Sequence, residues 1–460
     1  MRRLNVDPIR EIILDILVKI DSNQGYINVL VNQALKKNKI VKRDAAFIHE
    51  ITYGVIRNRI KIDWVISRFS ANKIDKMKIL IRNIVRMSIY QMLFLKKVPG
   101  YAACNEAVQL AKKYGNIKTA SFVNAILRNI IRRENEIKWP EKEKEPALYL
   151  SIMYSHPLWV IKRWIKRFGY ENTLKICIAN NTIPPLTIRT NTLKLNRSDL
   201  KETLEKEEIT GVEGQFTGEA LYVKAITNVS EHSGFKNGLF QIQDESSILV
   251  SHLVNPLPGE LVIDVCSAPG GKTTHLAQLM NNKGIVIAMD ISKNKLKTIN
   301  ANCNRLGINI VKILQHDATT TKKEYLNKAD KVLVDVPCSC LGVLRRKPDI
   351  KLQLFNRERL FQLSQLQLEI LSVSSDYVKE GGALIYSTCS TENEENREVV
   401  KKFLKRSPHF ELENLSTFNK KRNLIVNKSK ENEFIKIYPG ISNSNLDGFF
   451  MARMIKKGQY

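Results

Sequence analysis

A glycine-rich turn follows the first of several strand-like apolar runs in the second half of the chain. The run ends at Asp264, the turn contains Gly270 and Gly271, and a helix opens directly after it. Glycine lets the backbone pass close to a ligand. Asp290 stands nineteen residues after Gly271, at the end of the next apolar run, where a carboxylate can accept hydrogen bonds from both hydroxyls of a ribose. This pattern predicts a nucleoside-binding site.

Two other nucleotide-binding motifs fit this turn less well. Gly271-Lys272-Thr273 matches the end of a P-loop, but that motif needs glycine at the position of Cys266, so its phosphate-binding loop would be incomplete. The G-x-G-x-x-G pattern of NAD-binding proteins is absent from the sequence. Asp290 could also cap the helix that follows it, which is compatible with ribose binding.

Five apolar runs, separated by helical stretches or turns, suit the buried parallel strands of a doubly wound sheet. They are Leu261–Ile263, Ile285–Met289, Val311–Leu314, Lys331–Val334 and Ala383–Tyr386. The polar residues that follow them are Asp264, Asp290, Asp317, Asp335 and Ser387. Because the carboxyl ends of parallel strands form the ligand crevice, we expect these residues to converge on one site. Asp317 would contact an adenine amine there, or be a simple loop aspartate.

The part of the chain before this sheet predicts two further domains. Residues 1–138 have apolar residues at three-to-four spacing, which predicts an all-α bundle. Residues 139–240 begin with a charged, Pro-bearing linker and continue as a small α+β subdomain, with strands at 186–190 and 220–223 around a helix at 198–206. We expect residues 241–460 to form the Rossmann-like α/β domain.

Positive charge is concentrated towards the N-terminus. The chain has 73 Lys and Arg against 46 Asp and Glu, a net charge of +27, and residues 1–140 hold 27 basic and 11 acidic residues. Such an excess concentrates a polyanion at the surface, so nucleic acid is the expected partner. The positive charge could instead reflect solubility together with a composition rich in Lys and Asn.

The seven cysteines do not form the pattern of a disulfide framework. No apolar stretch approaches the length of a membrane span, and charges interrupt the first 20 residues, so we expect a cytoplasmic protein without a signal peptide. Cys338 and Cys340 could suggest a metal site or a redox couple. No second cysteine pair or histidine cluster accompanies them in the sequence, so no metal is expected. A monomer is expected.

Several segments together resemble RNA cytosine-C5 methyltransferases of the Sun/RsmB type. They are Val265–Thr273, Val334–Ser339, Gly342–Asp349 and Tyr386–Ser390, with further signatures at Gln243–Ser247 and Asp447–Ala452. One position departs from the family pattern, because Cys340 stands where glycine is common.

The N-terminal part is similar to the NusB-like RNA-binding domain of the 16S rRNA branch of this family. The similarity lies in Arg43-Asp44 with Tyr53–Val55, in Asn105–Val108 and in Phe122–Arg128. The last two segments fall in a stretch that predicts a helical hairpin broken near Gly115. The resemblance covers nearly the whole chain and implies an RNA substrate, 16S rRNA, with tRNA as the alternative.

The resemblance also implies S-adenosylmethionine as the cofactor and a role for each site residue. The cofactor-binding residues would be Cys266, Ser267, Ala268, Pro269, Gly270, Gly271, Lys272, Asp290, Asp317 and Asp335. The catalytic residues would be Cys389 as nucleophile, Cys338 as base, Asp335 at the N3 and N4 edge of the cytosine, and Lys272, which would polarise the cytosine or depress the cysteine pKa. Asp335 could instead cap its strand, and Lys272 could be a solvated side chain.

The chemistry explains why a nucleophile is needed. C5 of cytosine is too electron-poor to attack a methyl sulfonium directly. A thiolate that adds to C6 turns C5 into an enamine carbon, and a base must then remove the C5 proton so that the thiol can leave. The target base must also be flipped out of its stack. A free cysteine is often a core residue, but two cysteines at strand ends, each in its own signature, favour catalysis.

A second hypothesis is a non-catalytic RNA-binding or antitermination factor that keeps the methyltransferase fold as a relic. The presence of Cys389, Cys338, Asp290 and Asp335 favours the enzyme. Arg345, Arg346 and Lys347 are expected to meet RNA phosphates near the target base, or to be solvated charge.

Overall fold

The computed structural model describes residues 6–38, 40–95, 97–224, 229–353, 357–421, 432–442 and 445–458, and the chain divides into two compact units. Unit 1 comprises Met1–Thr182 and Leu344–Phe355, and unit 2 comprises Ile183–Val343 and Asn356–Tyr460. The chain therefore leaves unit 2 after Val343, contributes a short segment to unit 1 and returns. The sequence predicted three domains, with boundaries at residues 138 and 240, which differ from the two units. These boundaries stay a prediction.

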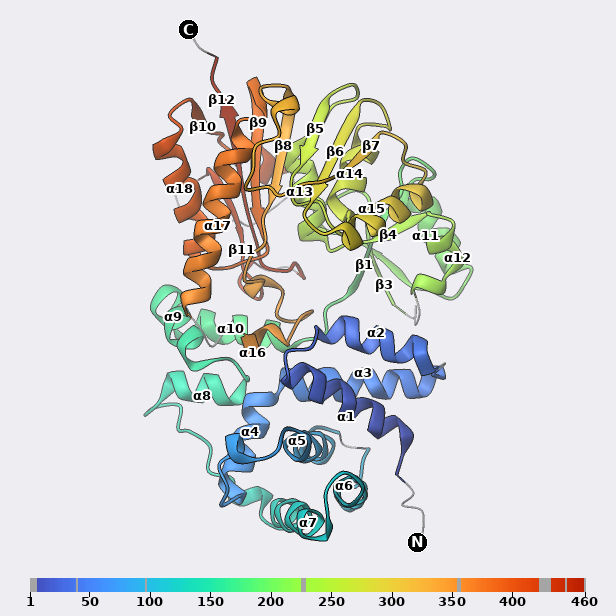
Figure 1. Ribbon diagram of the computed structural model, residues 1–460, viewed down its shortest axis with the longest axis vertical. Helices are drawn as coiled ribbons and strands as arrows, with labels where there is room; N and C mark the ends of the chain where they lie inside the picture. The colour runs from blue at the N-terminus through green and yellow to red at the C-terminus, as the bar shows by residue number, and fades with distance from the viewer. Residues whose placement is uncertain are drawn as a thin grey trace. The chain divides into compact units, whose positions relative to one another are not determined.

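Unit 1 contains helices and no strand in its described residues, as the apolar spacing predicts (Figure 1). Its helices are α1 (Pro8–Asp21), α2 (Ile27–Asn38), α3 (Lys42–Arg57), α4 (Arg59–Phe69), α5 (Ile79–Phe94), α6 (Gly100–Tyr114), α7 (Ile117–Arg132), α8 (Pro146–Met153), α9 (Leu158–Phe168), α10 (Tyr170–Asn181) and α16 (Ile350–Gln353). Buried residues of α1 to α7 form one hydrophobic core. In α1, Asp7 caps the first turn by accepting from the amide of Ile9, and Ile13 and Leu17 face the core.

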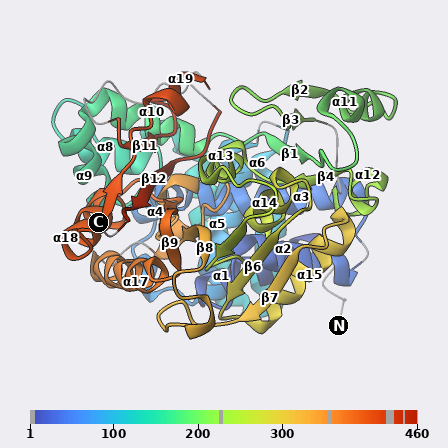
Figure 2. The ribbon, with the colours of Figure 1, turned by 90° about the horizontal axis from the view of Figure 1, so that it is seen from above.

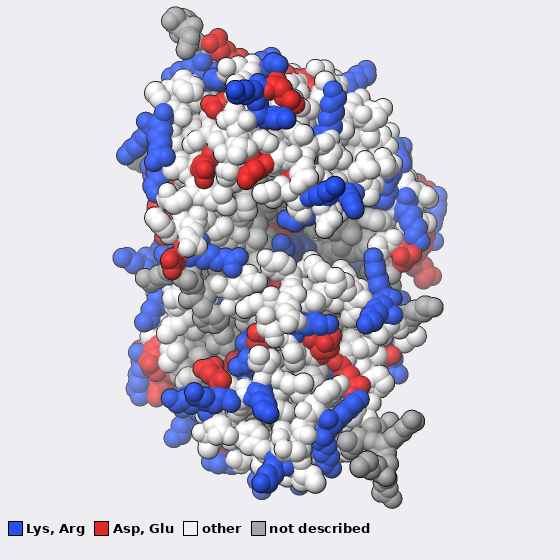
Figure 3. Space-filling view, in the orientation of Figure 1, with Lys and Arg blue, Asp and Glu red and all other residues white. Residues whose placement is uncertain are grey.

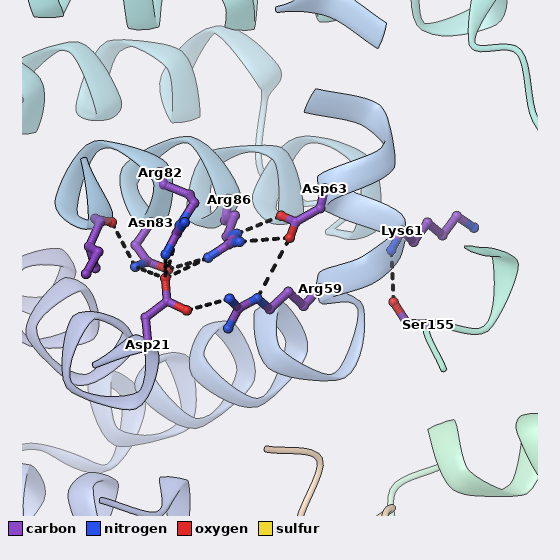
Figure 4. Close-up of polar contacts among 9 residues, drawn as sticks. Asp21, Arg59, Lys61, Asp63, Arg82, Asn83, Arg86 and Ser155 are labelled. Atoms are coloured by element: carbon purple, nitrogen blue, oxygen red, sulfur yellow. Dashed lines mark hydrogen bonds and ion pairs between the residues drawn. The ribbon is translucent and has the colours of Figure 1, made fainter. Parts of the chain in front are cut away.

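A buried ion network joins α1, α4 and α5 (Figure 4). Asp21, whose side chain is 2% exposed, pairs with Arg59 at 2.5 Å, with Arg82 at 2.8 Å and with Arg86 at 2.9 Å. Arg86 also donates to Asp63 at 2.7 Å. Burial by itself would raise the pKa of Asp21, but the three cations outweigh it and lower the pKa. The network fixes the contact of these helices because a buried charge that loses its partner is strongly destabilising.

Unit 2 begins with a four-stranded antiparallel sheet in the order β2-β3-β1-β4. Its elements are β1 (Leu186–Thr190), α11 (Arg197–Glu205), β2 (Gly211–Glu213), β3 (Ala220–Val223), α12 (Ser233–Lys236) and β4 (Phe240–Ile242). Ile188, Leu200, Leu221 and Phe240 are buried in a core of their own. The small α+β element predicted from the sequence is confirmed.

Within the described residues, the main sheet of unit 2 has eight strands. They are β5 (Leu261–Asp264), β6 (Ile285–Asp290), β7 (Val311–Gln315), β8 (Ala329–Asp335), β9 (Val378–Thr388), β10 (Phe410–Leu412), β11 (Phe434–Ile437) and β12 (Phe449–Lys456). The order β9-β8-β5-β6-β7 is parallel, β12 pairs antiparallel with β9, and β10 and β11 pair with β12. The five apolar runs predicted as parallel strands are therefore β5 to β9.

Helices cover both faces of this sheet (Figure 2). They are α13 (Glu245–Val254), α14 (Gly271–Leu279), α15 (Lys293–Leu306), α17 (Arg357–Ser375), α18 (Arg397–Arg406) and α19 (Ser416–Lys421). Alternate strand residues point to opposite faces. Val262 and Val286 pack in the core that contains α13, α14 and α15, whereas Ile263 and Ile287 pack in the core that contains α17 and α18. The sheet with helices on both faces is the Rossmann-like α/β core that the sequence predicted.

Short 3-10 helices lie at Ile74–Lys76, Glu134–Glu136, Val229–Glu231, Lys323–Tyr325, Leu341–Val343 and Asn393–Glu395. Within the described residues, no helix has the length and apolar character needed to span a membrane.

Candidate active site

The strand order of the main sheet reverses between β5 and β8, and ligands of such sheets bind at the carboxyl ends beside this point. Asp264, the last residue of β5, is buried and accepts a hydrogen bond from Thr273 Oγ1 at 2.7 Å, so the strand end is tied to the first turn of α14. Burial raises the pKa of Asp264 to about 7. Gly270, between them, has a φ of +95°, a conformation that favours glycine.

The glycine-rich loop is held from two sides. Ser267 donates to the carbonyl of Met289 from its amide and from its hydroxyl, each at 2.8 Å, which ties the loop to β6. Arg189 of β1, which is fully buried, donates to the carbonyl of Gly271 at 2.8 Å and to Thr274 Oγ1 at 3.1 Å. The backbone between Ser267 and Gly271 is therefore fixed before any ligand binds.

Asp290, the last residue of β6, lies half-buried against the same loop. Its Oδ2 accepts from the amide of Ala268 at 3.3 Å, and its Oδ1 accepts from the amide of Ser292 at 2.9 Å. Ser292, not Asp290, occupies the N-cap position of α15. A carboxylate has about four lone-pair sites, so Asp290 keeps acceptor capacity for the hydroxyls of a ribose.

Asp317 lies at the same edge of the sheet, in the turn after β7. Its side chain is exposed and accepts from the amide of Thr319 at 3.0 Å and from its hydroxyl at 2.8 Å. These two bonds lower the pKa of Asp317. The structure thus shows Asp317 in a local turn, and its contact with adenine stays a prediction.

Asp335, at the end of β8, joins α14 to β9. Its Oδ2 accepts from Lys272 Nζ at 2.6 Å and its Oδ1 accepts from Ser387 Oγ at 2.6 Å. The Lys272 ammonium also lies 5.3 Å from the ring centroid of Phe449. Burial would lower the pKa of Lys272, but the carboxylate of Asp335 outweighs it and raises the pKa. Lys272 therefore stays protonated beside the cysteines.

The structure brings the two predicted catalytic cysteines together. Cys389 follows β9, Cys338 follows β8, and their sulfur atoms are 3.2 Å apart. The sulfur of Cys340 is also close, because all three sulfurs lie within 4.8 Å of one another. Cys340 has a φ of +59°, which glycine would adopt without strain. The departure from the family pattern at this position thus places a third thiol beside the other two.

Both thiols have raised pKa values in this arrangement. Hydrogen bonds with Cys340 and Cys389, together with burial, raise the pKa of Cys338. The hydrogen bond with Cys338 lowers the pKa of Cys389, but the bond with Cys340, burial and the Asp335 carboxylate outweigh it and raise the pKa. The sequence suggested that Lys272 could depress the cysteine pKa. With Lys272 paired to Asp335, the pKa values of Cys338 and Cys389 are both raised.

Glu395 ties the two cysteine loops to each other, a role that the sequence did not reveal. It is fully buried and accepts from the amide of Ser339 at 2.7 Å, from Ser390 Oγ at 2.5 Å and from Gln367 Nε2 at 3.0 Å. Burial raises the pKa of Glu395. Ser339 follows Cys338 and Ser390 follows Cys389, so one carboxyl group sets the spacing of both thiols.

Two glycines of separate signatures interlock beside Cys389. The amide of Gly342 donates to the carbonyl of Cys389 at 2.9 Å, and the amide of Gly448 donates to the carbonyl of Gly342 at 2.8 Å. A Cβ atom on Gly342 would lie 2.1 Å from the carbonyl oxygen of Gly448. This close approach explains why glycine stands at both positions.

The segment after the Cys338 loop corrects one expectation from the sequence. Arg345 is only 4% exposed, and its carbonyl accepts from Arg57 Nη2 at 3.4 Å within unit 1. Asp349, in the same segment, accepts from the amide of Ile27 at 3.2 Å. Arg345 is therefore packed into the helical unit and does not face RNA as expected, whereas Lys347 is exposed.

Two groups of side chains in the described residues have ligand types and spacing suited to a metal ion. One is the three thiols, and the other is Glu219 with His252 and His275. Glu219 Oε1 lies 2.7 Å from Nε2 of His252 and 2.8 Å from Nε2 of His275. Burial and the nearby Arg189 lower the pKa of His275 to about 3, despite the Glu219 carboxylate. The sequence shows no such cluster because its members come from a loop, α13 and α14.

Three parts of the chain match models of known protein families. Residues 251–455 match the model of the 16S rRNA methyltransferase RsmB/F family, residues 7–132 match the NusB family, and residues 156–230 match the ferredoxin-like domain of the RsmF/B-like methyltransferases. The chain is similar to the "Probable ribosomal RNA small subunit methyltransferase B" of Bacillus subtilis (strain 168), with 37% identity over 98% of this chain and 99% of the relative.

Other relatives and solved structures are also similar. A "Probable ribosomal RNA small subunit methyltransferase B" of Synechocystis is 33% identical over 86% of this chain and 88% of its own. The "Crystal Structure of PH0851" has a TM-score of 0.82 and 27% identity, covering 98% of this chain and 99% of that chain. The structure of "NSun6 from Pyrococcus horikoshii with SFG" has a TM-score of 0.56 and 25% identity, covering 65% of this chain and 97% of that chain.

The methyltransferase fold, the helical N-terminal part and full-length similarity to curated relatives lead to one conclusion. The chain belongs to the RsmB/F family of 16S rRNA methyltransferases and carries a NusB domain at its N-terminal end.

Proposed function

We propose that this protein transfers a methyl group from S-adenosylmethionine to C5 of a cytosine in 16S rRNA through a covalent bond between Cys389 and C6. The observation that carries the proposal is the pair of thiols 3.2 Å apart at the ends of β8 and β9. A reaction that adds a nucleophile and later eliminates it needs one group to attack and a second to remove the proton. The two cysteines provide both groups at one place.

S-adenosylmethionine would bind along the loop from Cys266 to Gly271, with its ribose on Asp290, its adenine near Asp317 and its methyl group towards the cysteines. The free acceptor capacity of Asp290 and the fixed backbone of the loop support this placement. A similar structure contains SFG, an analogue of S-adenosylmethionine. When bound, S-adenosylmethionine supplies an electrophilic methyl group.

Asp335 and Lys272 are placed to hold the edge of a flipped cytosine beside Cys389. The Asp335 carboxylate would accept from the N4 amino group, and from N3 once N3 carries a proton. The Lys272 ammonium would stabilise the negative charge that the thiolate brings to the base. Because these two side chains already pair at 2.6 Å, the site is polarised before the base enters it.

The proton and electron balance of the cycle fits the two thiols. Cys389 would release its proton to solvent and its sulfur would bond to C6, so that the electron pair of the C5–C6 double bond becomes available at C5 and takes the methyl group, leaving S-adenosylhomocysteine. Cys338, after releasing its own proton to solvent, would accept the C5 proton as a thiolate; the C5–H electron pair re-forms the C5–C6 double bond while the C6–S bond breaks with its electrons returning to Cys389. While Cys389 is bonded to C6, its hydrogen bond no longer raises the pKa of Cys338.

The RNA partner is supported by charge as well as by the family. Lys and Arg side chains are spread over the face shown in Figure 3, and the net charge of the chain is +27. Such a surface attracts a polyphosphate.

Nucleoside analysis tests the proposal. The protein is incubated with S-adenosylmethionine labelled in its methyl group and with unmodified bacterial 16S rRNA, and the digested RNA is separated into nucleosides. The proposal predicts label in 5-methylcytidine. Label in another methylated nucleoside would refute the C5 chemistry. RNA binding without transfer of label would favour the non-catalytic RNA-binding factor.

A further inference from the structure

Cys340 adds a third thiol to the two that the proposed reaction uses. Cys338 and Cys340 belong to the loop after β8, Cys389 follows β9, and these two strands pair with each other (Figure 1). The sulfurs of Cys338 and Cys389 are 3.2 Å apart, and all three sulfurs lie within 4.8 Å of one another. Each of the three residues is half-buried. The proposed reaction gives a role to two of these thiols and leaves Cys340 unexplained.

The spacing of the three sulfurs fits a tetrahedral metal ion. Zinc binds cysteine sulfur at about 2.3 Å, so two sulfurs on one tetrahedral zinc ion are about 3.8 Å apart. This separation lies between the 3.2 Å of Cys338 and Cys389 and the 4.8 Å limit of the cluster. The short pair would need to open by about half an ångström to reach it. Thiolate ligands also select Zn²⁺ over Mg²⁺ or Ca²⁺, which prefer oxygen.

The backbone on either side of Cys340 is held in place. The amide of Ser339, just before it, donates to Glu395 at 2.7 Å. The amide of Gly342, two residues after it, donates to the carbonyl of Cys389 at 2.9 Å. The loop that carries Cys340 is therefore bonded directly to the residue that carries the Cys389 thiol. A ligand set that is already assembled loses little conformational freedom when it binds.

The charges around the three thiols allow a cation to bind. Lys272 and Asp335 form an ion pair at 2.6 Å and offset each other, so a metal ion has to balance only the thiolates themselves. Metal binding releases the thiol protons to solvent. The second group of metal-binding side chains in the part of the chain that the structure describes is less suited. There the buried Arg189 cation, which lowers the pKa of His275, would also repel a metal ion.

We propose that Cys338, Cys340 and Cys389 together bind a Zn²⁺ ion that reversibly switches methyl transfer off. The three thiols release their protons to solvent and their sulfurs donate electron pairs to the ion, whose fourth position stays open for water. Cys389 then has no electron pair to attack C6, and Cys338 cannot accept the C5 proton. A chelator that removes the ion restores both groups. The metal site follows from the three sulfurs alone, whereas its effect on activity rests on the proposed function.

Cobalt binding tests the site without reference to activity. Co²⁺ replaces Zn²⁺ in tetrahedral sites, and thiolate ligands give it a charge-transfer band in the near ultraviolet that nitrogen and oxygen ligands do not give. The full chain, kept reduced by a phosphine, is titrated with Co²⁺ and then with Zn²⁺. The parent should show the thiolate band, and Zn²⁺ should remove it. A spectrum without this band would overturn the proposal, and bands of nitrogen and oxygen ligands alone would place the ion at His252 and His275.

Substitution of Cys340 isolates the third ligand. Cys340→Ser keeps the Cβ atom and removes one of three sulfur ligands, so affinity for Co²⁺ and Zn²⁺ should fall about 100-fold, the share of one ligand in a zinc site. Cys340→Gly, which relieves the positive φ, should lose affinity to the same extent. The matched control is Cys303→Ser, which removes a buried thiol of α15 outside the cluster and should bind metal like the parent. Parent-like affinity in both Cys340 variants would overturn the proposal.

Inhibition of methyl transfer links the metal site to the proposed function. Transfer of label to 16S rRNA is measured at buffered Zn²⁺ concentrations, and each variant is compared with its own rate without metal. Cys340→Ser should need about 100-fold more free Zn²⁺ for the same inhibition as the parent and Cys303→Ser, and a chelator should restore transfer. Equal sensitivity of all three proteins, or no inhibition of the parent, would overturn the switch.

The two experiments separate this inference from the proposed function. If the thiolate band is absent while 5-methylcytidine forms, the metal inference fails and the proposed function stands. If the band is present while label enters another nucleoside, the metal site stands and the proposed C5 chemistry fails.

Discussion

Replacing Lys351 with methionine should make the stability of unit 1 less dependent on pH. Lys351 belongs to the segment that follows the Cys338 loop and packs into unit 1, where its side chain is 1% exposed. Its Nζ donates to Asn181 Oδ1 at 2.8 Å and to the carbonyl of Arg57 at 3.4 Å. Burial lowers its pKa from 10.5 to about 7, even though the Cys177 thiol opposes this shift.

The sign of the effect follows from the proton count. Between pH 7 and 10.5 the unfolded chain holds a proton on Lys351 that the folded chain has released, so stability rises with pH across this window. The penalty of the buried ammonium is complete below pH 7, where both states are protonated. From these two pKa values it amounts to about 5 kcal/mol at pH 6 and about 2 kcal/mol at pH 9.

Methionine has a similar volume and removes this titration. The substitution also leaves Asn181 and the carbonyl of Arg57 without their donor, at a cost of about 1–3 kcal/mol that does not change with pH. Lys351→Met should therefore stabilise unit 1 at pH 6, and this gain should shrink by about 2.5 kcal/mol by pH 9. The change with pH, not the absolute gain, identifies the buried ammonium.

Denaturant unfolding followed by tryptophan fluorescence measures this difference. All four tryptophans of the chain, Trp64, Trp139, Trp159 and Trp164, lie in unit 1, so the signal reports on that unit. Lys175→Met, an exposed lysine of α10, is the matched control and should give a difference that is flat with pH. A flat difference for Lys351→Met as well would mean that the ammonium carries no burial penalty, and the reasoning would be wrong.

Three further substitutions test the site in unit 2. Asp290→Ala should weaken binding of S-adenosylmethionine by about 1.5–3 kcal/mol, because hydrogen bonds to a charged group are lost. RNA affinity should stay nearly constant. If isothermal titration shows unchanged cofactor affinity, the nucleoside binds elsewhere. Gly342→Ala should destabilise unit 2 by about 1–3 kcal/mol, because its Cβ would lie 2.1 Å from the Gly448 carbonyl oxygen; a normal unfolding curve would contradict the close approach. Cys340→Gly should raise stability by about 1 kcal/mol by relieving its positive φ and should keep methyl transfer; a loss of transfer would give Cys340 a part in the reaction.

The sequence allowed the sheet and the convergence of the site to be predicted. Each parallel strand is an apolar run followed by a polar residue, and parallel strands place their carboxyl ends at one edge. Asp264, Asp290 and Asp335 therefore could be assigned to one crevice without coordinates. Cys338 and Cys389 could be assigned to it for the same reason.

The contacts that fix the site could not be predicted, because they join residues far apart in the chain. Glu395 accepts from two loops whose spacing depends on how β8 and β9 pair. Arg189 reaches the glycine-rich loop from a separate sheet. The burial of Arg345 is a further example, since a run of basic residues in a sequence predicts exposure, and only tertiary packing places this one in unit 1.

The formation of a covalent complex by the two cysteine variants tests the central claim most directly. Each variant is incubated with 16S rRNA and S-adenosylmethionine and run on a denaturing gel. Cys338→Ala should still attack and methylate the base but release it poorly, so an RNA-linked protein band should persist. Cys389→Ala should give neither band nor methylation, and the double variant should also lack the band. A band that persists in Cys389→Ala and is missing in Cys338→Ala would contradict the assignment of Cys389 as the nucleophile.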